Sequence, residues 1–157
     1  MIFVTSGSML PFDRLFKTID KAVADGIITD TVFGQIGEGK YTPQHFKYER
    51  FVDKNDFDRY VLEANLVIGH AGIGVITQAL DSKTPLLVMA RLSEFGEHVN
   101  DHQVSTANKF EELGHVLSFD ENNLTEKLQK VTSFIPKPRN PNVDGVGDRV
   151  AQFLGSL

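Results

Sequence analysis

The chain has 157 residues, and its 16 Lys and Arg against 21 Asp and Glu give a net charge of −5 at pH 7; it can bury one well-formed core but not two full-sized domains. The acidic balance offers no basic footprint for nucleic acid, and no apolar run approaches the roughly 20 residues of a membrane-spanning helix, so we expect no nucleic-acid partner and no direct membrane insertion. The absence of cysteine excludes disulfides, and the first residues lack the features of a signal peptide, which together fit a cytosolic protein.

Strand-like and helix-like patterns alternate along the chain. Short apolar, β-rich runs predict strands, and apolar residues at helical spacing predict helices. In chain order, the expected elements are strand 2–5, helix 11–23, strand 31–35, strand 48–52, helix 56–64, strand 65–68, a helix from the turn at 69–74 to 80, strand 85–89, helix 97–113, strand 116–118 and helix 124–134.

The central strands are continuously apolar. The segments 66–68 (LVI) and 86–88 (LLV) do not alternate with polar residues, which indicates burial on both faces of a parallel sheet covered by helices. We therefore expect residues 1–135 to form a doubly wound α/β domain with a mainly parallel sheet of about six strands. Because ligands bind such sheets beyond the carboxyl ends of the strands, one site should be faced by the loops at 6–10, 36–45, 69–74 and 90–101.

Residues 136–157 have a different pattern. Three prolines predict an extended connector, namely Pro136, Pro138 and Pro141. The tail beyond them has an apolar stripe at helical spacing, formed by Val146, Val150, Phe153, Leu154 and Leu157. Such a stripe either packs on the chain's own core or docks onto a partner protein, and we expect docking.

Two glycine-containing turns follow predicted strands, TSGS at 5–8 and GHAGIG at 69–74. Free backbone N–H groups and the positive end of a helix dipole favour a phosphate at such turns, whereas the simpler interpretation is that the glycines serve only a tight backbone. Two such turns in one parallel sheet suggest a diphosphate-bearing ligand. A nicotinamide cofactor is not expected, because the first turn has a single glycine where the dinucleotide fingerprint has three.

Acidic and histidine residues crowd the junction between the loop at 90–101 and the next helix: Glu94, Glu97, His98, Asp101 and His102. On one continuous helix, His98 and His102 would share a face, which leaves a metal site open. The zincin pattern is absent, because Val99 stands where that chemistry places its general base. The alternatives are that Asp101, His102 and Gln103 bind a polar ligand such as a sugar, or that the acids only complement the helix dipole. We expect no protein-bound metal and no cofactor.

Three segments resemble the glycosyltransferase family 28 C-terminal domain. They are MIFVTSGSMLPFDRL, NLVIGHAGIGVITQAL and PLLVMARLSEFGEHVNDHQ, and the likeness runs from Met1 to about Leu128. Within the family, the chain is most similar to stand-alone PssE-type capsule and exopolysaccharide subunits and to the cytosolic subunit of the eukaryotic two-part UDP-GlcNAc transferase of dolichol-linked glycan assembly. The resemblance implies a Rossmann-like donor half of a GT-B enzyme that binds a UDP-sugar.

The resemblance also implies residue roles. Gly7, Ser8 and the turn His70, Ala71, Gly72, Ile73 and Gly74 would lie near the diphosphate; Phe51 and Val52 would receive uracil; and Glu97, His98, Asp101, His102 and Gln103 would face the sugar. Thr5 and Arg91 complete this substrate site. Gln78 stands where relatives often carry a Glu for the ribose hydroxyls, so its hydrogen bond would lack charge assistance. The candidate catalytic residues are His70, Glu97 and His98, while the base that deprotonates the acceptor is unassigned and can lie on a partner.

A GT-B site lies between two domains, and this chain has one. The resemblance therefore implies a membrane-associated partner subunit that binds the lipid-linked saccharide acceptor and holds this cytoplasmic chain at the inner face of the membrane. The expected activity is inverting transfer of a hexose from UDP in polysaccharide or glycan synthesis. Two alternatives are a UDP-sugar epimerase or hydrolase and a non-catalytic accessory of a separate transferase.

Overall fold

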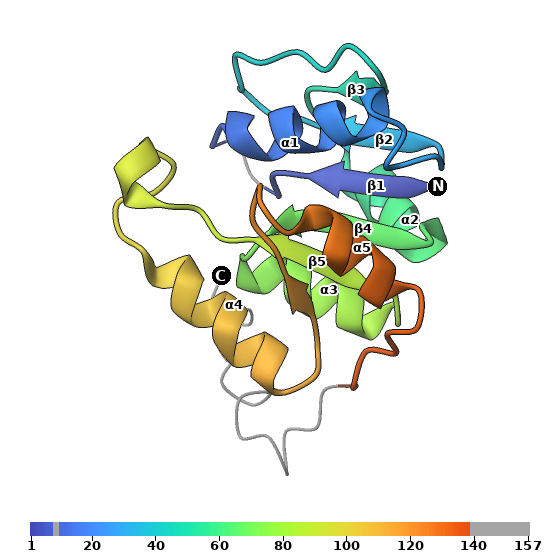
Figure 1. The fold of residues 1–157 in the computed structure, drawn as a ribbon, viewed down its shortest axis with the longest axis vertical. Coiled ribbons are helices and arrows are strands. Elements are labelled where there is room, and N and C mark those ends of the chain that lie inside the picture. The colour runs from blue at the N-terminus through green and yellow to red at the C-terminus, as the bar shows by residue number, and fades with distance from the viewer. Residues whose placement is uncertain (8–9, 139–157) are drawn as a thin grey trace.

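The computed structural model describes residues 1–7 and 10–138, which form an α/β domain around a six-stranded parallel sheet (Figure 1). The strand order is β3-β2-β1-β4-β5-β6, so the expected doubly wound fold is confirmed. The strands are β1 (Ile2–Thr5), β2 (Val32–Gln35), β3 (Lys47–Glu49), β4 (Leu66–His70), β5 (Leu86–Met89) and β6 (Leu117–Ser118), and the helices are α1 (Asp13–Ala24), α2 (Lys54–Glu63), α3 (Ile73–Asp81), α4 (His102–Glu112) and α5 (Leu124–Val131).

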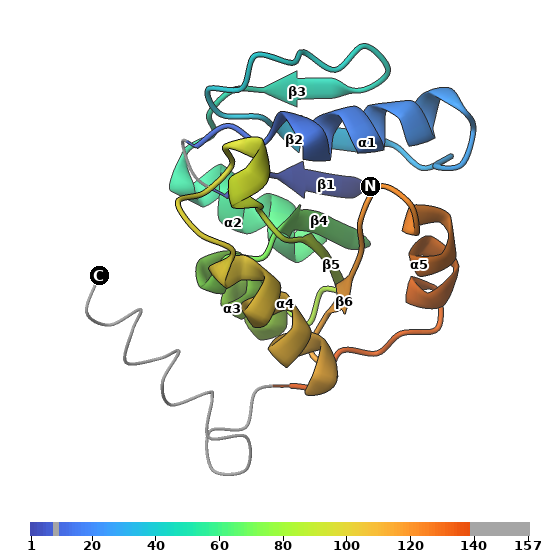
Figure 2. The same ribbon diagram turned by 60° about the vertical axis from the view of Figure 1, so that its left-hand side comes forward.

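The core consists of two apolar clusters, one on each face of the sheet. Helices α1 and α5 cover the face that carries Val4 and Ile68, and helices α2, α3 and α4 cover the face that carries Phe3 and Val67 (Figure 2). Successive residues of a strand point to opposite faces, so a strand covered by helices on both sides must be apolar at every position. This explains the absence of alternation in the central strands.

The third strand ends earlier than its sequence pattern predicted. The pattern extended it to Val52, whereas β3 spans Lys47–Glu49. The Asp53 side chain caps α2 by accepting a hydrogen bond from the Asp56 N–H at 2.8 Å. Because this cap starts the helix at Lys54, Phe51 and Val52 lie in the connection between β3 and α2.

The helix predicted over 97–113 begins only at His102. A short 3-10 turn, η1 (Ser93–Phe95), precedes it and ends at Gly96 with a φ of 70°. The Glu97 carboxylate then binds Arg14 on α1, at 2.9 Å from both Nε and one terminal nitrogen, which fixes this part of the chain outside the helix. The prediction that His98 and His102 share a helical face is therefore wrong.

The order in which the chain adds strands to the sheet reverses between β1 and β4. These strands are neighbours, with Thr5 paired to Gly69, yet the chain leaves β1 toward α1 on one face and β4 toward α3 on the other. In doubly wound sheets, ligands bind at such a switch point, beyond the carboxyl ends of the strands. The two glycine turns noted in the sequence begin here, side by side.

Two parts of the earlier interpretation fall outside the described residues: Ser8, and the tail beyond residue 138 with Pro141 and the apolar stripe. Docking of that tail therefore stays a prediction.

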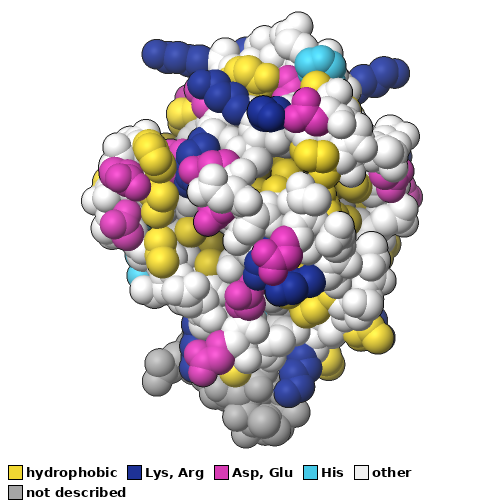
Figure 3. Space-filling model, viewed as in Figure 1, with side chains coloured by type: hydrophobic (Ala, Val, Ile, Leu, Met, Phe, Trp, Pro, Cys, Tyr) yellow, Lys and Arg dark blue, Asp and Glu magenta, His cyan; other side chains and the backbone are white. Residues whose placement is uncertain are grey.

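Within the described part of the chain, every helix is too short or too polar to cross a membrane. On the face that Figure 3 shows, acidic and basic side chains of the described residues are interspersed.

Candidate functional site

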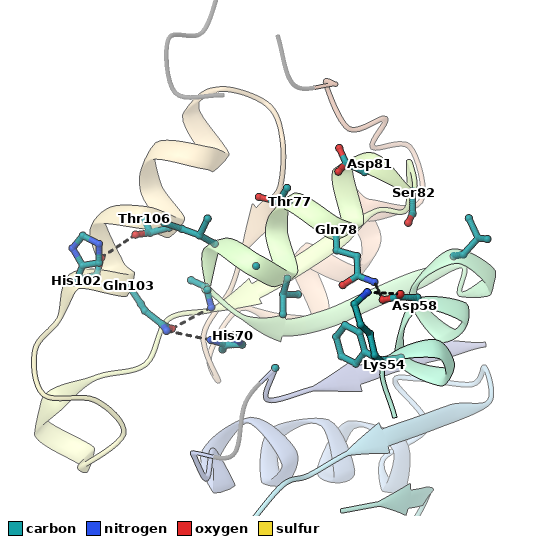
Figure 4. Close-up of a pocket in the computed structure, with 18 of the residues that line it drawn as sticks. Lys54, Asp58, His70, Thr77, Gln78, Asp81, Ser82, His102, Gln103 and Thr106 are labelled. Atoms are coloured by element: carbon teal, nitrogen blue, oxygen red, sulfur yellow. Dashed lines mark hydrogen bonds and ion pairs between the residues drawn. The ribbon is translucent and has the colours of Figure 1, made fainter. Parts of the chain in front are cut away.

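A cavity of about 1200 Å³ opens beside the switch point. Its lining runs from Gly7 across the turn at 70–74 to two flanking helices, with α2 on one side and α4 on the other (Figure 4). The sequence-predicted residues that line it are Gly7, His70, Ala71, Gly72, Ile73, Gly74, Gln78, His98, His102 and Gln103. Residues from three separate segments of the chain thus meet in one cavity.

The His70 ring lies between the two glycine turns. A Cβ added at Gly7 would come within 2.1 Å of His70 Nε2, and one added at Gly72 would come within 2.1 Å of His70 Cε1. Gly7 also has a φ of 71°, which a residue with a side chain rarely adopts. Glycine is therefore needed at both positions because a side chain there would collide with the imidazole.

At position 74, by contrast, no such collision explains the choice of glycine. It lies in the first turn of α3, and a Cβ there would meet no atom within 4 Å. Glycine in a helix is less favourable than alanine by roughly 0.5–1 kcal/mol, so the fold alone would favour a side chain. The first N–H groups of α3 have no carbonyl one turn earlier to accept from them, and they lie at the positive end of the helix dipole. This open surface is suited to the close approach of an anion.

Gln103 joins His70 to the ends of two strands. Its Oε1 accepts hydrogen bonds from the Ala71 N–H at 3.2 Å and the Arg91 N–H at 3.1 Å, and its Nε2 lies 3.1 Å from His70 Nδ1. Burial, together with the positive charge of Arg91, lowers the pKa of His70 from 6.5 to about 3. His70 is therefore neutral at pH 7.

Arg91 is buried beneath the site and is absent from the cavity lining. Its side chain is 1% exposed and donates hydrogen bonds to the carbonyls of Ser6, Leu10 and Pro11 at 2.8 to 3.1 Å. The guanidinium also lies over the Phe12 ring, 4.7 Å from its centre. Arg91 thus binds the described residues that follow β1, and any effect on a ligand would pass through them.

Two acidic candidates of the loop before α4 are turned away from the cavity. Glu97 is paired with Arg14 and accepts a further hydrogen bond from the Leu92 N–H at 2.9 Å. Asp101 accepts two hydrogen bonds from Ser93, which lower the pKa of its carboxyl group. His98 and His102, by contrast, line the cavity. Among the described residues, no three His, Asp or Glu side chains gather as a metal site would require.

The α2 side of the cavity holds a charged pair that sequence reasoning missed. Gln78 Nε2 donates to Asp58 Oδ1 at 2.5 Å, and Lys54 binds the other oxygen of Asp58 at 2.9 Å (Figure 4). The sequence offered only the i,i+4 spacing of Lys54 and Asp58, which is common on solvent-exposed helices. Phe51, 51% exposed, and Val52 lie outside the cavity lining.

Thr5 supports the first turn from inside the fold. It is fully buried, its hydroxyl donates to Gln35 Oε1 at 2.6 Å, and the same oxygen accepts from the Gly7 N–H at 2.8 Å. Thr5 therefore fixes the backbone at Gly7, and its hydroxyl hydrogen is directed toward β2.

The fold and the site together define a class of protein. A doubly wound sheet with an open, glycine-containing helix N-terminus at its switch point is the arrangement that binds nucleotide phosphates. The glycosyltransferase family 28 C-terminal domain matches residues 1–146, and the chain belongs to this family.

Individual relatives agree with the family assignment. The chain is 32% identical over 124 residues to the human UDP-N-acetylglucosamine transferase subunit ALG13, a match that covers 73% of this chain and 10% of the human protein. The mouse protein of the same name is 30% identical over 87 residues, covering 52% and 7%. The chain thus spans about a tenth or less of the length of these curated relatives.

Solved structures show the same fold. The solution structure of ALG13 superposes with a TM-score of 0.59 and 22% identity, covering 92% of this chain and 93% of that one. The crystal structure of Acinetobacter baumannii MurG gives a TM-score of 0.60 at 15% identity, covering 96% of this chain and 49% of MurG.

The low pKa of His70 makes stability depend on pH. Between pH 6.5 and about 3, the unfolded chain binds a proton at this residue and the native protein does not, so the free energy of unfolding falls as the pH is lowered through that range, by up to about 1.4 kcal/mol per pH unit. Urea unfolding at several pH values should show a shallower acid loss for His70→Asn than for the wild type. Parallel curves for the two proteins would show that His70 titrates normally in the native state.

Proposed function

We propose that this chain is the donor-binding catalytic subunit of an inverting glycosyltransferase that takes its sugar from UDP. The observation that carries the proposal is the open first turn of α3 at the switch point, where Gly74 leaves space that the fold does not need. Membership of glycosyltransferase family 28 and likeness to a subunit named for UDP-N-acetylglucosamine support a UDP-sugar as the ligand.

The chemistry of transfer can proceed here through hydrogen bonding. The acceptor hydroxyl attacks C1 of the sugar, the bond from C1 to the UDP oxygen breaks, and negative charge grows on the diphosphate. The N–H groups at the start of α3 and the neutral His70 ring would stabilise that charge. With a pKa of about 3, His70 is a weak base, so the proton of the acceptor must go to another group, such as His98 or His102 at the cavity edge or a side chain of a partner.

We propose that a second protein supplies the acceptor. The described residues form one α/β domain with the cavity beside its switch point. We propose that a membrane-associated subunit completes the site and presents a lipid-linked saccharide, with this chain held peripherally at the cytoplasmic face. A PssE-type capsule or exopolysaccharide subunit and a subunit for dolichol-linked glycans both fit this scheme.

The two alternative functions make different demands. An epimerase or hydrolase needs its own acid and base at the sugar, yet the carboxylate of Glu97 is bound to Arg14 on α1 and that of Asp101 to Ser93. A non-catalytic accessory would need no donor site at all. Assaying sugar transfer by the purified chain, by its partner and by the pair separates the three: we expect transfer only by the pair. Turnover of UDP-sugar by the chain alone would favour a hydrolase or epimerase, and transfer by the partner alone would favour a non-catalytic accessory.

UDP should bind the isolated chain without a divalent metal, because the proposed diphosphate contacts are N–H donors. Calorimetry in EDTA measures this directly. Loss of UDP binding on chelation, with recovery on adding Mg²⁺ or Mn²⁺, would contradict the metal-free site.

Gly74→Leu separates ligand binding from folding. The added side chain enters open space and replaces glycine with a better helix former, so thermal stability should be unchanged or higher, while UDP affinity should fall by about tenfold or more as the phosphate is displaced. The matched control is Gln129→Leu, which adds the same exposed side chain on α5, away from the cavity. Wild-type UDP affinity in Gly74→Leu would contradict phosphate binding at this turn.

His102→Ala tests the sugar-facing side. His102 is exposed on α4 and lines the cavity, so its loss should weaken UDP-sugar binding by about 0.5–1.5 kcal/mol and leave UDP binding nearly unchanged. Calorimetry with both ligands gives the comparison. An equal loss for UDP and UDP-sugar would place the effect at the nucleotide instead.

A further inference from the structure

We propose that Gln103 is a positioning residue that fixes the tautomer of His70, so that His70 Nε2–H serves as a neutral hydrogen-bond donor to a phosphate of the bound nucleotide. The part that concerns phosphate rests on the proposed function. The part that concerns the tautomer rests only on hydrogen bonds within the protein.

The orientation of the Gln103 amide follows from its neighbours. One end of the amide faces two backbone N–H groups, those of Ala71 and Arg91, at 3.2 and 3.1 Å. Two donors can be satisfied only by an oxygen, because an NH₂ group in that place would meet them as a third donor. The end that faces His70 is therefore the NH₂ group. Gln103 is 7% exposed, so water has little access to replace these bonds.

The tautomer of His70 follows from the amide. Gln103 Nε2 is a donor and lies 3.1 Å from His70 Nδ1, so Nδ1 must accept and carry no proton (Figure 4). In a neutral imidazole the single proton then resides on Nε2. The reverse tautomer would set N–H against N–H at this distance.

The surroundings keep the ring neutral. The charged or titratable groups that act on His70 are Arg91, at the end of β5, and His98, in the loop before α4, and both disfavour a second positive charge. From the remaining sides, the ring is met by Gly7, Gly72 and the Gln103 amide. In the part of the chain that the structure describes, no carboxylate acts on the ring to stabilise an imidazolium.

The Nε2–H group is the free end of this chain of hydrogen bonds. Among the described residues, none accepts a hydrogen bond from it, and it lies at the place that a side chain at Gly7 would fill, in the cavity lining. A donor that is neutral and held in one direction can bind a phosphate oxygen without first being desolvated as a cation. Gln103, which the sequence placed against the sugar, thus acts at the diphosphate through His70.

The tautomer can be read directly by NMR. In protein labelled with ¹⁵N at histidine, the His70 signals are assigned as those lost in His70→Asn, among the five histidines of the chain. At pH 7 without ligand, we expect an unprotonated Nδ1 and a protonated Nε2. A proton on Nδ1, or a charged ring, would overturn the proposal.

Gln103→Glu provides the sharpest variant. Its carboxylate can still accept from Ala71 and Arg91 but cannot donate to Nδ1, so His70 should take up a proton on Nδ1, either as the other tautomer or as an imidazolium with a raised pKa. Ser105→Ala, an exposed change on the same helix and outside the cavity lining, should leave the His70 signals unchanged. If Gln103→Glu does not fold, Gln103→Met removes the donor without adding charge and should give a mixture of tautomers. A pure Nε2–H signal in the folded variant would contradict a positioning role.

The phosphate contact is tested separately. In the wild type, UDP should shift the His70 Nε2–H resonance and uridine should not, and Gln103→Met should weaken UDP and UDP-sugar binding equally, by about tenfold. Loss confined to UDP-sugar would return Gln103 to a direct sugar contact and overturn the proposal. If UDP fails to bind the wild type at all, the proposed function fails with the phosphate contact, whereas the tautomer is still decided by the ligand-free spectrum.

Discussion

The site depends on how the His70 ring fits between the turns at Gly7 and Gly72, which lie 65 positions apart in the sequence (72 − 7) yet are adjacent in the sheet. β1 and β4 pair directly, so the turn at Gly7 and the turn at Gly72 lie on either side of one imidazole, and neither position has room for a Cβ. Gln103 closes the arrangement from α4 by bonding the ring and the ends of β4 and β5. The His70 ring and the Gln103 amide thereby connect the segments that follow β1, β4 and β5 at the switch point.

Much of the fold was predictable because burial leaves a local trace. Strands enclosed by helices must be apolar throughout, and 66–68 and 86–88 show this in the sequence itself. The glycine turns were also recognised in the sequence, but the reason for two of their glycines was not. The spacing suggested room for a phosphate, whereas the structure shows that Gly7 and Gly72 make room for His70. Among the described glycines of these two turns, only Gly74 has no atom within 4 Å of the place where a Cβ would lie.

The remainder of the site depends on pairings between distant residues. The bond between Arg14 and Glu97 joins residues 83 positions apart, and no periodicity marks it. That pair keeps Glu97 out of both the helix and the cavity, although its neighbours in sequence made it a plausible catalytic acid. Likewise, the buried Arg91 binds backbone carbonyls near the first turn, and Asp58 meets Gln78 across two helices. Propensity and spacing describe elements, whereas these contacts arise only when the elements pack.

The central claim is that a diphosphate binds at the switch point, against the first turn of α3. The most direct measurement is a titration of ¹⁵N-labelled protein with UDP in EDTA, followed through the backbone amide resonances. We expect the largest shifts at Gly7, which lines the cavity, and at residues 72–74, which line it at the start of α3. Largest shifts at the separate cavity lined by Arg14, Lys17 and Phe95, or no shifts at saturating UDP, would contradict the account.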